Sequence, residues 1–287
     1  MICTYYIVLS VAVTMFGIQF LFNQGYQKEN GNGAGAVFTV SLLSGLVGGV
    51  FLTAVNRFQL GYTPFTLLCA LAAALNSLLY SLCALKALSR INLSLYSLLA
   101  MLGGMLLPFF TGLLFYNEPM TVGKGVCVAL VIAALLLTLR RESGKGGGIY
   151  YCGVFVLNGM SGVIAKIFSS APYEKASAAS FSVWSALITV AFSAVALALL
   201  HTKRAVKRPS GKACGLAIGS GALSQIANYM LLLALAVLPS SVQYPFVTGG
   251  VMVVSTLIAA LTGQKPSRRE YASVALAFAG VLALVLL

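Results

Sequence analysis

The sequence predicts an all-α integral membrane protein, and three observations carry this prediction. Of the 287 residues, 60% are hydrophobic and only 8% are charged, which is too little charge to cover the surface of a soluble domain. The apolar runs are each about 20 residues long, the length that a helix needs to cross a bilayer. They are continuous, whereas the strands of a membrane β-barrel would alternate apolar and polar residues.

Ten apolar runs follow one another, and short connections between them hold most of the charge. In chain order they lie at 5–22, 34–55, 64–87, 92–115, 121–139, 149–168, 177–200, 212–237, 242–262 and 270–287. The first run lacks the basic segment and the small-residue cleavage pattern of a signal peptide, so we expect a retained helix. The glycine-rich connections 31–35 and 144–148 follow no strand and lack the spacing of a phosphate-binding loop. The sequence therefore predicts ten transmembrane helices.

The formal net charge of +13 indicates topology and not a nucleic-acid ligand, because the basic residues are unevenly placed. Fourteen of the 18 Lys and Arg residues lie in odd-numbered connections, and the other four are Arg57, Lys124, Lys166 and Lys175. Since cytoplasmic connections are enriched in Lys and Arg, the odd-numbered connections are expected in the cytoplasm and both termini outside. We expect a multi-pass protein of a bacterial plasma membrane, with the lipid bilayer as its surroundings.

Six cysteines are scattered through the apolar runs without C-x-x-C or Cys/His pairing. This pattern indicates small core residues and predicts neither disulfides nor a metal site. No cofactor is expected.

The two halves of the chain resemble each other, which indicates an internal repeat. The matching positions are 143 to 150 residues apart and include Tyr5-Tyr6 with Tyr150-Tyr151, Gly17 with Gly162, and Gly103-Gly104 with Gly249-Gly250. The first unit spans residues 1–143 and the second 144–287, and each holds five helices. Because five is odd, the second unit enters the membrane from the opposite side. Such inverted repeats are a hallmark of alternating-access transporters.

Three motifs resemble one known family. They are A-L-x-x-L with Tyr96 downstream (84–96), N-E-P-M-T (117–121), and A-L-A-V-L-P-S-S-V-Q-Y-P-F-V-T-G-G (234–250). Each half of the chain resembles an EamA-type unit of the drug/metabolite transporter superfamily. This resemblance implies one transmembrane bundle with a central cavity, lined mainly by helices 1, 3, 4, 6, 8 and 9. One departure is Lys265, which stands where such units often carry a glutamate like Glu118.

Polar side chains within the apolar runs are candidates for substrate binding, because exposing them to lipid is costly. They are Asn76, Tyr80, Tyr96, Asn158, Lys166, Gln225, Asn228, Gln243 and Tyr244. The alternative for each is a hydrogen bond that only joins neighbouring helices. For Lys166 the ammonium group either attracts an acidic substrate or extends to the membrane interface.

Glycine and proline residues in two of the runs are expected to shape the bundle. Gly103, Gly104, Gly249 and Gly250 allow close helix packing, and Pro108 and Pro245 free backbone carbonyls at bends inside the membrane.

We expect a transporter that moves a small polar or amphipathic organic metabolite by alternating access, as a facilitator, exchanger or exporter. All five acidic residues lie in connections or at helix ends, which argues against a proton-coupled cation exporter of the small multidrug type. The alternatives are a non-transporting receptor or scaffold and an intramembrane enzyme using Lys166 or His201. No nucleophile partner or metal-ligand spacing lies near either residue, so we expect no enzyme. The partner is a small-molecule substrate and not nucleic acid, and the chain is a monomer or homodimer.

Overall fold

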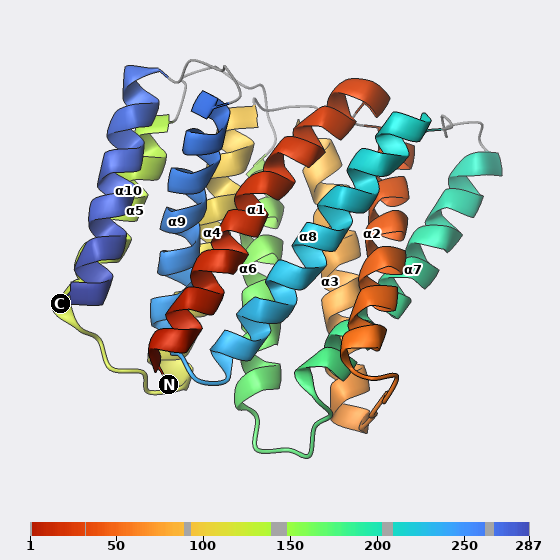
Figure 1. Ribbon diagram of the computed structural model, residues 1–287, viewed down its shortest axis with the longest axis horizontal. Coiled ribbons are helices and arrows are strands. Elements are labelled where there is room, and N and C mark those ends of the chain that lie inside the picture. The colour runs from red at the N-terminus through yellow and green to blue at the C-terminus, as the bar shows by residue number, and fades with distance from the viewer. Residues whose placement is uncertain are drawn as a thin grey trace.

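The computed structural model describes residues 2–31, 33–88, 93–138, 148–202, 209–261 and 267–286, and these residues form helices without any strand. The described residues form ten helices, which Figure 1 shows packed into one bundle. They are α1 (Ile2–Asn30), α2 (Ala34–Val55), α3 (Pro64–Leu88), α4 (Leu93–Phe115), α5 (Val122–Thr138), α6 (Gly148–Ser170), α7 (Ala178–Thr202), α8 (Gly211–Leu235), α9 (Ser240–Leu261) and α10 (Arg268–Leu286).

The first helix is longer than the sequence predicts, because its polar end is held by neighbouring helices. Asn23 accepts a hydrogen bond from Ser220 Oγ at 2.5 Å. Tyr26 donates to the carbonyl of Ala36 at 3.0 Å, and Asn30 donates to the Tyr26 hydroxyl at 2.7 Å. The 29 residues of α1 span about 44 Å at 1.5 Å per residue. This exceeds the thickness of a bilayer core, and Figure 1 shows α1 inclined across the bundle beside α8.

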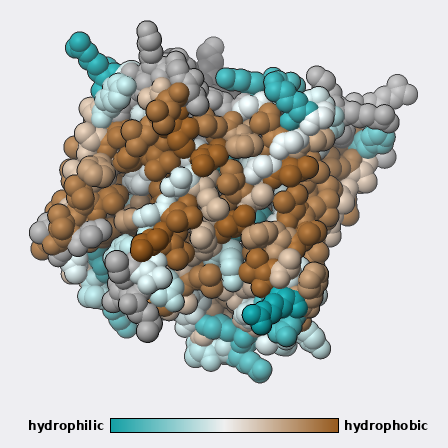
Figure 2. All heavy atoms as spheres, viewed as in Figure 1, coloured by the Kyte–Doolittle hydropathy of each residue, from teal (hydrophilic) through white to brown (hydrophobic). Residues whose placement is uncertain are grey.

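Seven of the helices are long and apolar enough to cross a membrane, namely α1, α2, α3, α6, α7, α8 and α9. The described apolar parts of α4, α5 and α10 are shorter, at 10–17 residues. Large apolar side chains such as Val50 and Leu114 are exposed on the outside. Figure 2 shows this apolar surface between hydrophilic residues at the top and bottom of the view. The arrangement is consistent with a multi-pass membrane protein.

The helix contacts come in matching pairs. Helix α1 packs against α8 and α3 against α6, while α1 also packs against α9 and α4 against α6. The contact of α2 with α8 is matched by that of α3 with α7. Three further extensive contacts, α2 with α7, α5 with α10 and α4 with α9, each correspond to themselves. The contact of α9 with α10 is the exception, because the corresponding contact of α4 with α5 is much smaller. Exchanging α1–α5 with α6–α10 in order therefore preserves the other extensive contacts.

Both ends of the described chain lie on the same side of the bundle (Figure 1). We call this side the terminal face, and it also holds the connections 56–63, 116–121, 171–177 and 236–239. The end of α1, the starts of α2 and α8 and the start of α10 lie on the opposite face.

Glycines allow three pairs of helices to pack closely, α4 with α6, α1 with α9, and α9 with α10. A Cβ added at Gly103 of α4 would overlap the carbonyl of Phe155 on α6, and one added at Gly104 would lie 2.7 Å from Asn158 Nδ2. Between α1 and α9, a Cβ at Gly250 would lie 3.0 Å from Val13 Cγ1. Gly249 faces α10 instead, where a Cβ would lie 2.9 Å from Val281 Cγ2. Close packing at these positions requires the absence of a side chain.

Two prolines, Pro108 in α4 and Pro245 in α9, stand inside helices and are fully buried. A proline cannot donate to the carbonyl one turn earlier, so each helix has a carbonyl free of its usual partner. The carbonyl of Pro108 itself accepts a hydrogen bond from Ser240 Oγ at 3.1 Å, which joins α4 to the start of α9.

The apolar core is divided among helix interfaces. One cluster joins α4, α5, α9 and α10 around Met105, Val131 and Met252. Another joins α3, α6, α7 and α8, where the rings of Phe168 and Phe181 stack at 4.2 Å. The described cysteines, Cys69, Cys83, Cys127, Cys152 and Cys214, are all free.

Candidate functional site

A cavity of about 540 Å³ lies within the bundle and is lined by residues of α1–α4 and α6–α9. We call it the central cavity. Its volume falls in the range of about 300 to 1,000 Å³ that is typical of small-molecule sites. The polar side chains that line it are Gln19, Ser41, Ser44, Ser77, Asn158, Ser161, Ser182, Ser185, Thr189, Ser224, Gln225, Asn228, Gln243, Tyr244 and Thr248.

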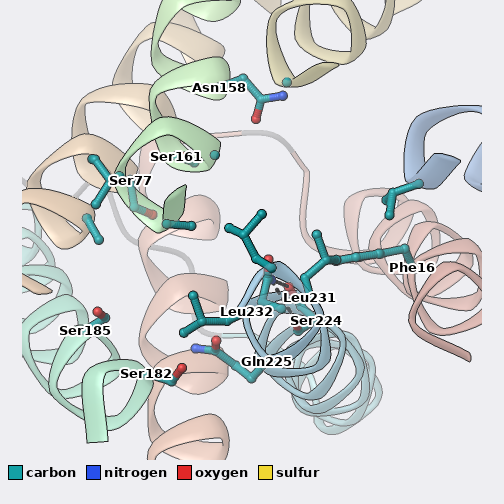
Figure 3. A pocket seen from close by; sticks show the side chains of 18 of the residues that line it. Phe16, Ser77, Asn158, Ser161, Ser182, Ser185, Ser224, Gln225, Leu231 and Leu232 are labelled. Carbon is teal, nitrogen blue, oxygen red and sulfur yellow. Dashed lines mark hydrogen bonds between the residues drawn. The ribbon is translucent and has the colours of Figure 1, made fainter. Parts of the chain in front are cut away.

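No charged side chain is among the described residues that line the central cavity. Figure 3 shows Asn158 and Ser161 on α6, Ser182 on α7 and Gln225 on α8 around a common space. Apolar side chains complete the lining, including Phe16, Phe181, Leu231 and Leu232. The wall is therefore amphipathic and formally neutral.

Three of the five amide side chains of the lining direct their nitrogens to backbone carbonyls of the protein. Asn158 Nδ2 donates to the carbonyl of Ala100 at 2.6 Å, and Asn228 Nδ2 donates to the carbonyl of Ser224 at 2.8 Å. Gln243 Nε2 donates to the carbonyl of Leu231 at 2.9 Å. Because a carbonyl oxygen can only accept, these bonds fix which end of each amide carries the nitrogen.

The hydroxyl groups of α7 behave in a similar way. Ser182 donates to the carbonyl of Ala178 at 2.9 Å, Ser185 to that of Phe181 at 2.9 Å, and Thr189 to that of Ser185 at 2.8 Å. Positions 182, 185 and 189 follow helical spacing, which places them on one face of α7. Each hydroxyl proton is used within the helix, and the oxygen lone pairs remain for other groups.

Two adjacent residues of α9 take part in the lining. Tyr244 donates its hydroxyl proton to the carbonyl of Gly162 at 3.1 Å, which joins α9 to α6. Gln243 is fully buried, and its Oε1 atom has no hydrogen-bond partner among the described residues. The site therefore contains an unpaired buried acceptor.

Two predicted site residues on α3 lie at a helix interface instead. Asn76 is buried and donates to the Leu157 carbonyl and to Ser161 Oγ, both at 2.9 Å. Tyr80 follows one turn later on the same face and packs around Val154 of α6. Neither residue lines the central cavity, which Ser77 reaches because it is rotated by about 100° from Asn76.

Lys166 lies outside the lining of the central cavity and pairs with Glu118. Its Nζ atom is 2.7 Å from Glu118 Oε1, and only 8% and 7% of the two side chains are exposed. The ammonium group also lies 5.0 Å from the centre of the Tyr116 ring. Lys166 thus forms a buried ion pair near the end of α6, outside the lining of the central cavity.

Glu118 at the same time caps the N-terminus of α9. Its carboxylate accepts from the backbone N–H groups of Ser240 at 2.9 Å and Ser241 at 2.8 Å, and from Ser240 Oγ at 3.0 Å. The first N–H groups of a helix have no partner within the helix, so a carboxylate is well placed there. Burial alone would raise the pKa of Glu118, but the bonds from Lys166 and the two serines lower it to about 2.

The structure adds residues that the sequence reasoning missed and leaves one undecided. Helices α2 and α7 contribute Ser41, Ser44 and the α7 hydroxyls, although the resemblance implies helices 1, 3, 4, 6, 8 and 9 as the main lining. The spacing of these hydroxyls along one helix face was the available signal. Tyr96 lies on α4, but its side chain falls outside the described part of the structure.

Within the described residues, no group of three or more His, Cys, Asp or Glu is placed to hold a metal ion.

Comparison with known proteins establishes the fold alone. No protein-family model and no curated protein matches the chain. One solved structure, described only as a crystal structure of a protein, is similar over 99% of this chain and 98% of its own. The TM-score is 0.74 and the sequence identity is 18%. The two chains therefore share an overall arrangement of helices, and this likeness carries no statement about a ligand.

Proposed function

We propose that the protein is a membrane transporter for a small polar or amphipathic organic metabolite. The observation that carries this proposal is the central cavity, a space of about 540 Å³ with an amphipathic, uncharged wall inside a bundle whose outside is apolar. Polar groups within the membrane cost free energy and usually mark a functional site. Binding a polar solute and releasing it on the other side of the bilayer would account for the polar groups of this cavity.

The paired helix contacts support an inverted repeat. Exchanging α1–α5 with α6–α10 preserves the extensive contacts other than that of α9 with α10, and both halves contribute to the lining of the central cavity. We infer two five-helix units, residues 1–143 and 144–287, similar to those of EamA-type transporters. Rocking of one unit against the other would open the cavity first to one side and then to the other.

The orientation proposed from the charges places the terminal face outside a bacterial plasma membrane. Four basic residues, Arg57, Lys124, Lys166 and Lys175, lie in or beside the connections of this face. Two of them are buried, and Lys166 is neutralised by Glu118. The remaining 14 basic residues belong in the sequence to the odd-numbered connections, which this orientation assigns to the cytoplasm.

Reconstituted vesicles test the proposal. We expect the purified protein to carry at least one solute from a panel of amino acids, nucleosides, sugars, organic anions and organic cations. Ser185→Phe places a ring in the central cavity and should abolish this flux. Val195→Phe adds the same ring on the same helix at an exposed outer position and should not. Absence of flux for every compound, or full activity of Ser185→Phe in a folded protein, would contradict the proposal.

A further inference from the structure

We infer that the central cavity selects solutes that donate hydrogen bonds, through hydroxyl, amide N–H or ammonium groups, and rejects solutes whose polar groups only accept. Carboxylates belong to the rejected class. This inference rests on the proposed function and specifies its substrate class. It follows from the hydrogen-bonding groups that the wall leaves unused.

The first step is the orientation of the amides. Asn158, Asn228 and Gln243 each donate an amide N–H to a backbone carbonyl, with N···O distances of 2.6, 2.8 and 2.9 Å. A reversed amide would set oxygen against oxygen at these distances, so the orientations are fixed. The amide oxygens, which can only accept, are the ends left without a backbone partner.

The second step concerns the hydroxyls of α7. Ser182, Ser185 and Thr189 all donate to carbonyls of their own helix at 2.8 to 2.9 Å. A hydroxyl has one proton and two lone pairs, so a hydroxyl whose proton is used can only accept from a ligand. Together with the amide oxygens, these three hydroxyls present a group of acceptors to a ligand in the cavity.

The third step is the unpaired acceptor on α9. Gln243 is fully buried, and its Oε1 atom has no partner among the described residues although its Nε2 atom has one. Leaving a buried acceptor unpaired costs free energy, which a ligand N–H or O–H group at this position would recover. An acceptor-only solute would leave the cost in place.

The fourth step is the absence of a counter-charge for an anion. No Lys or Arg is among the described residues of the lining, and Lys166 is held at 2.7 Å by Glu118. A carboxylate entering this cavity would lose its hydration without gaining an ionic partner. Other lining groups such as Gln225 and Ser44 carry donors as well, so a solute that both donates and accepts is expected to bind best.

A matched set of five probes tests the inference by thermal stabilisation of the purified protein. The probes are 3-phenylpropionamide, its N,N-dimethyl amide, 3-phenylpropan-1-ol, 3-phenylpropylamine and 3-phenylpropionate. We expect the amide and the alcohol to raise the unfolding temperature, since a ligand bound to the folded state shifts the equilibrium. The dimethyl amide, which keeps the shape and the acceptor but has no donor, should not. The amine distinguishes ammonium donors from neutral ones.

Three outcomes would overturn the inference. They are equal stabilisation by the dimethyl amide and the parent amide, equal stabilisation by the carboxylate, and stabilisation by none of the five. Stabilisation by the amine alone among the donors supports ammonium solutes, and stabilisation by the amide and alcohol supports neutral ones.

Variants locate the effect in the central cavity. Gln243→Met removes the unpaired acceptor, and the double variant Ser182→Ala, Ser185→Ala removes two hydroxyls that bond only to their own helix. We expect each to weaken binding of 3-phenylpropionamide at least tenfold, and the double variant preserves the test if Gln243→Met does not fold. Ser81→Ala is the matched control, because Ser81 donates to the Ser77 carbonyl at 2.8 Å and does not line the cavity. Unchanged affinity in the double variant would contradict the inference.

Flux measurements separate this inference from the proposed function. If the amide stabilises the protein but neither the amide nor any compound of the panel is carried into vesicles, the binding preference stands and transport fails. If vesicles take up the amide, the dimethyl amide and the carboxylate equally, transport stands and the preference for donors fails.

Discussion

At the scale of single residues, Gly103 shows most clearly how the bundle depends on close backbone contact. A Cβ at this position would overlap the Phe155 carbonyl, which belongs to the backbone and cannot rotate away. We predict that Gly103→Ala lowers the unfolding temperature in detergent. Gly215→Ala is the control, because nothing lies within 4 Å of a Cβ there and alanine favours a helix. Equal stability of both variants would contradict this account of the α4–α6 interface.

The residue scale is also where prediction from sequence reaches its limit. Exposing an amide side chain to lipid costs free energy wherever it lies in an apolar helix. This cost is enough to predict that Asn76, Asn158 and Gln243 face inwards. It does not tell the cavity face of a helix from a packing face, because adjacent residues differ by only about 100° of rotation. Asn76 therefore joins α3 to α6, while Ser77, a weaker signal in the sequence, lines the cavity.

At the scale of helices, the start of α9 is fixed by a side chain from a distant connection. Glu118 binds the first N–H groups of α9 and the ammonium of Lys166. We predict that Glu118→Gln destabilises the protein by about 3 to 5 kcal/mol, because it leaves Lys166 buried without its partner. Glu29→Gln breaks the exposed pair with Lys212 and should cost less than about 1 kcal/mol. Chemical denaturation of the two variants measures the difference, and similar losses would contradict the role of Glu118.

The same pair predicts a dependence of stability on pH. The folded-state pKa of Glu118 is about 2, below the ordinary value of 4.5. A lowered pKa stabilises the fold above the ordinary value, and this contribution is lost as pH falls from about 4.5 towards 2. We expect the unfolding temperature of the parent to drop more steeply than that of Glu118→Gln between pH 5 and 3. Parallel curves would show that Glu118 is not the group responsible.

Helix number was predictable from hydropathy, whereas helix ends and cavity faces were not. The end of α1 is polar from Asn23 onwards and looks like a connection, yet contacts with Ser220 and Ala36 continue the helix to Asn30. The residues of α7 that line the cavity were missed because serine and threonine are common within hydrophobic helices. Their hydroxyls usually donate to backbone carbonyls of their own helix, so they do not stand out in the sequence. Their collective role appears only when eight helices are placed around one space.

At the scale of the whole molecule, the charge distribution predicts orientation. Gln59 is exposed on the terminal face, and Arg269 is exposed at the start of α10 on the opposite face. In a variant without the six native cysteines, we predict that Gln59→Cys reacts with an impermeant thiol reagent added to intact cells and that Arg269→Cys does not. The reverse pattern would place the termini inside.

The central claim is that the central cavity opens in turn to the two sides of the membrane, and labelling of Ser185→Cys from each side tests it most directly. The protein, again without its native cysteines, is reconstituted in one orientation, and an impermeant thiol reagent is added to one side at a time. The account predicts modification from both sides, slowed by a solute that the protein carries. Modification from one side only, or from neither, would contradict alternating access.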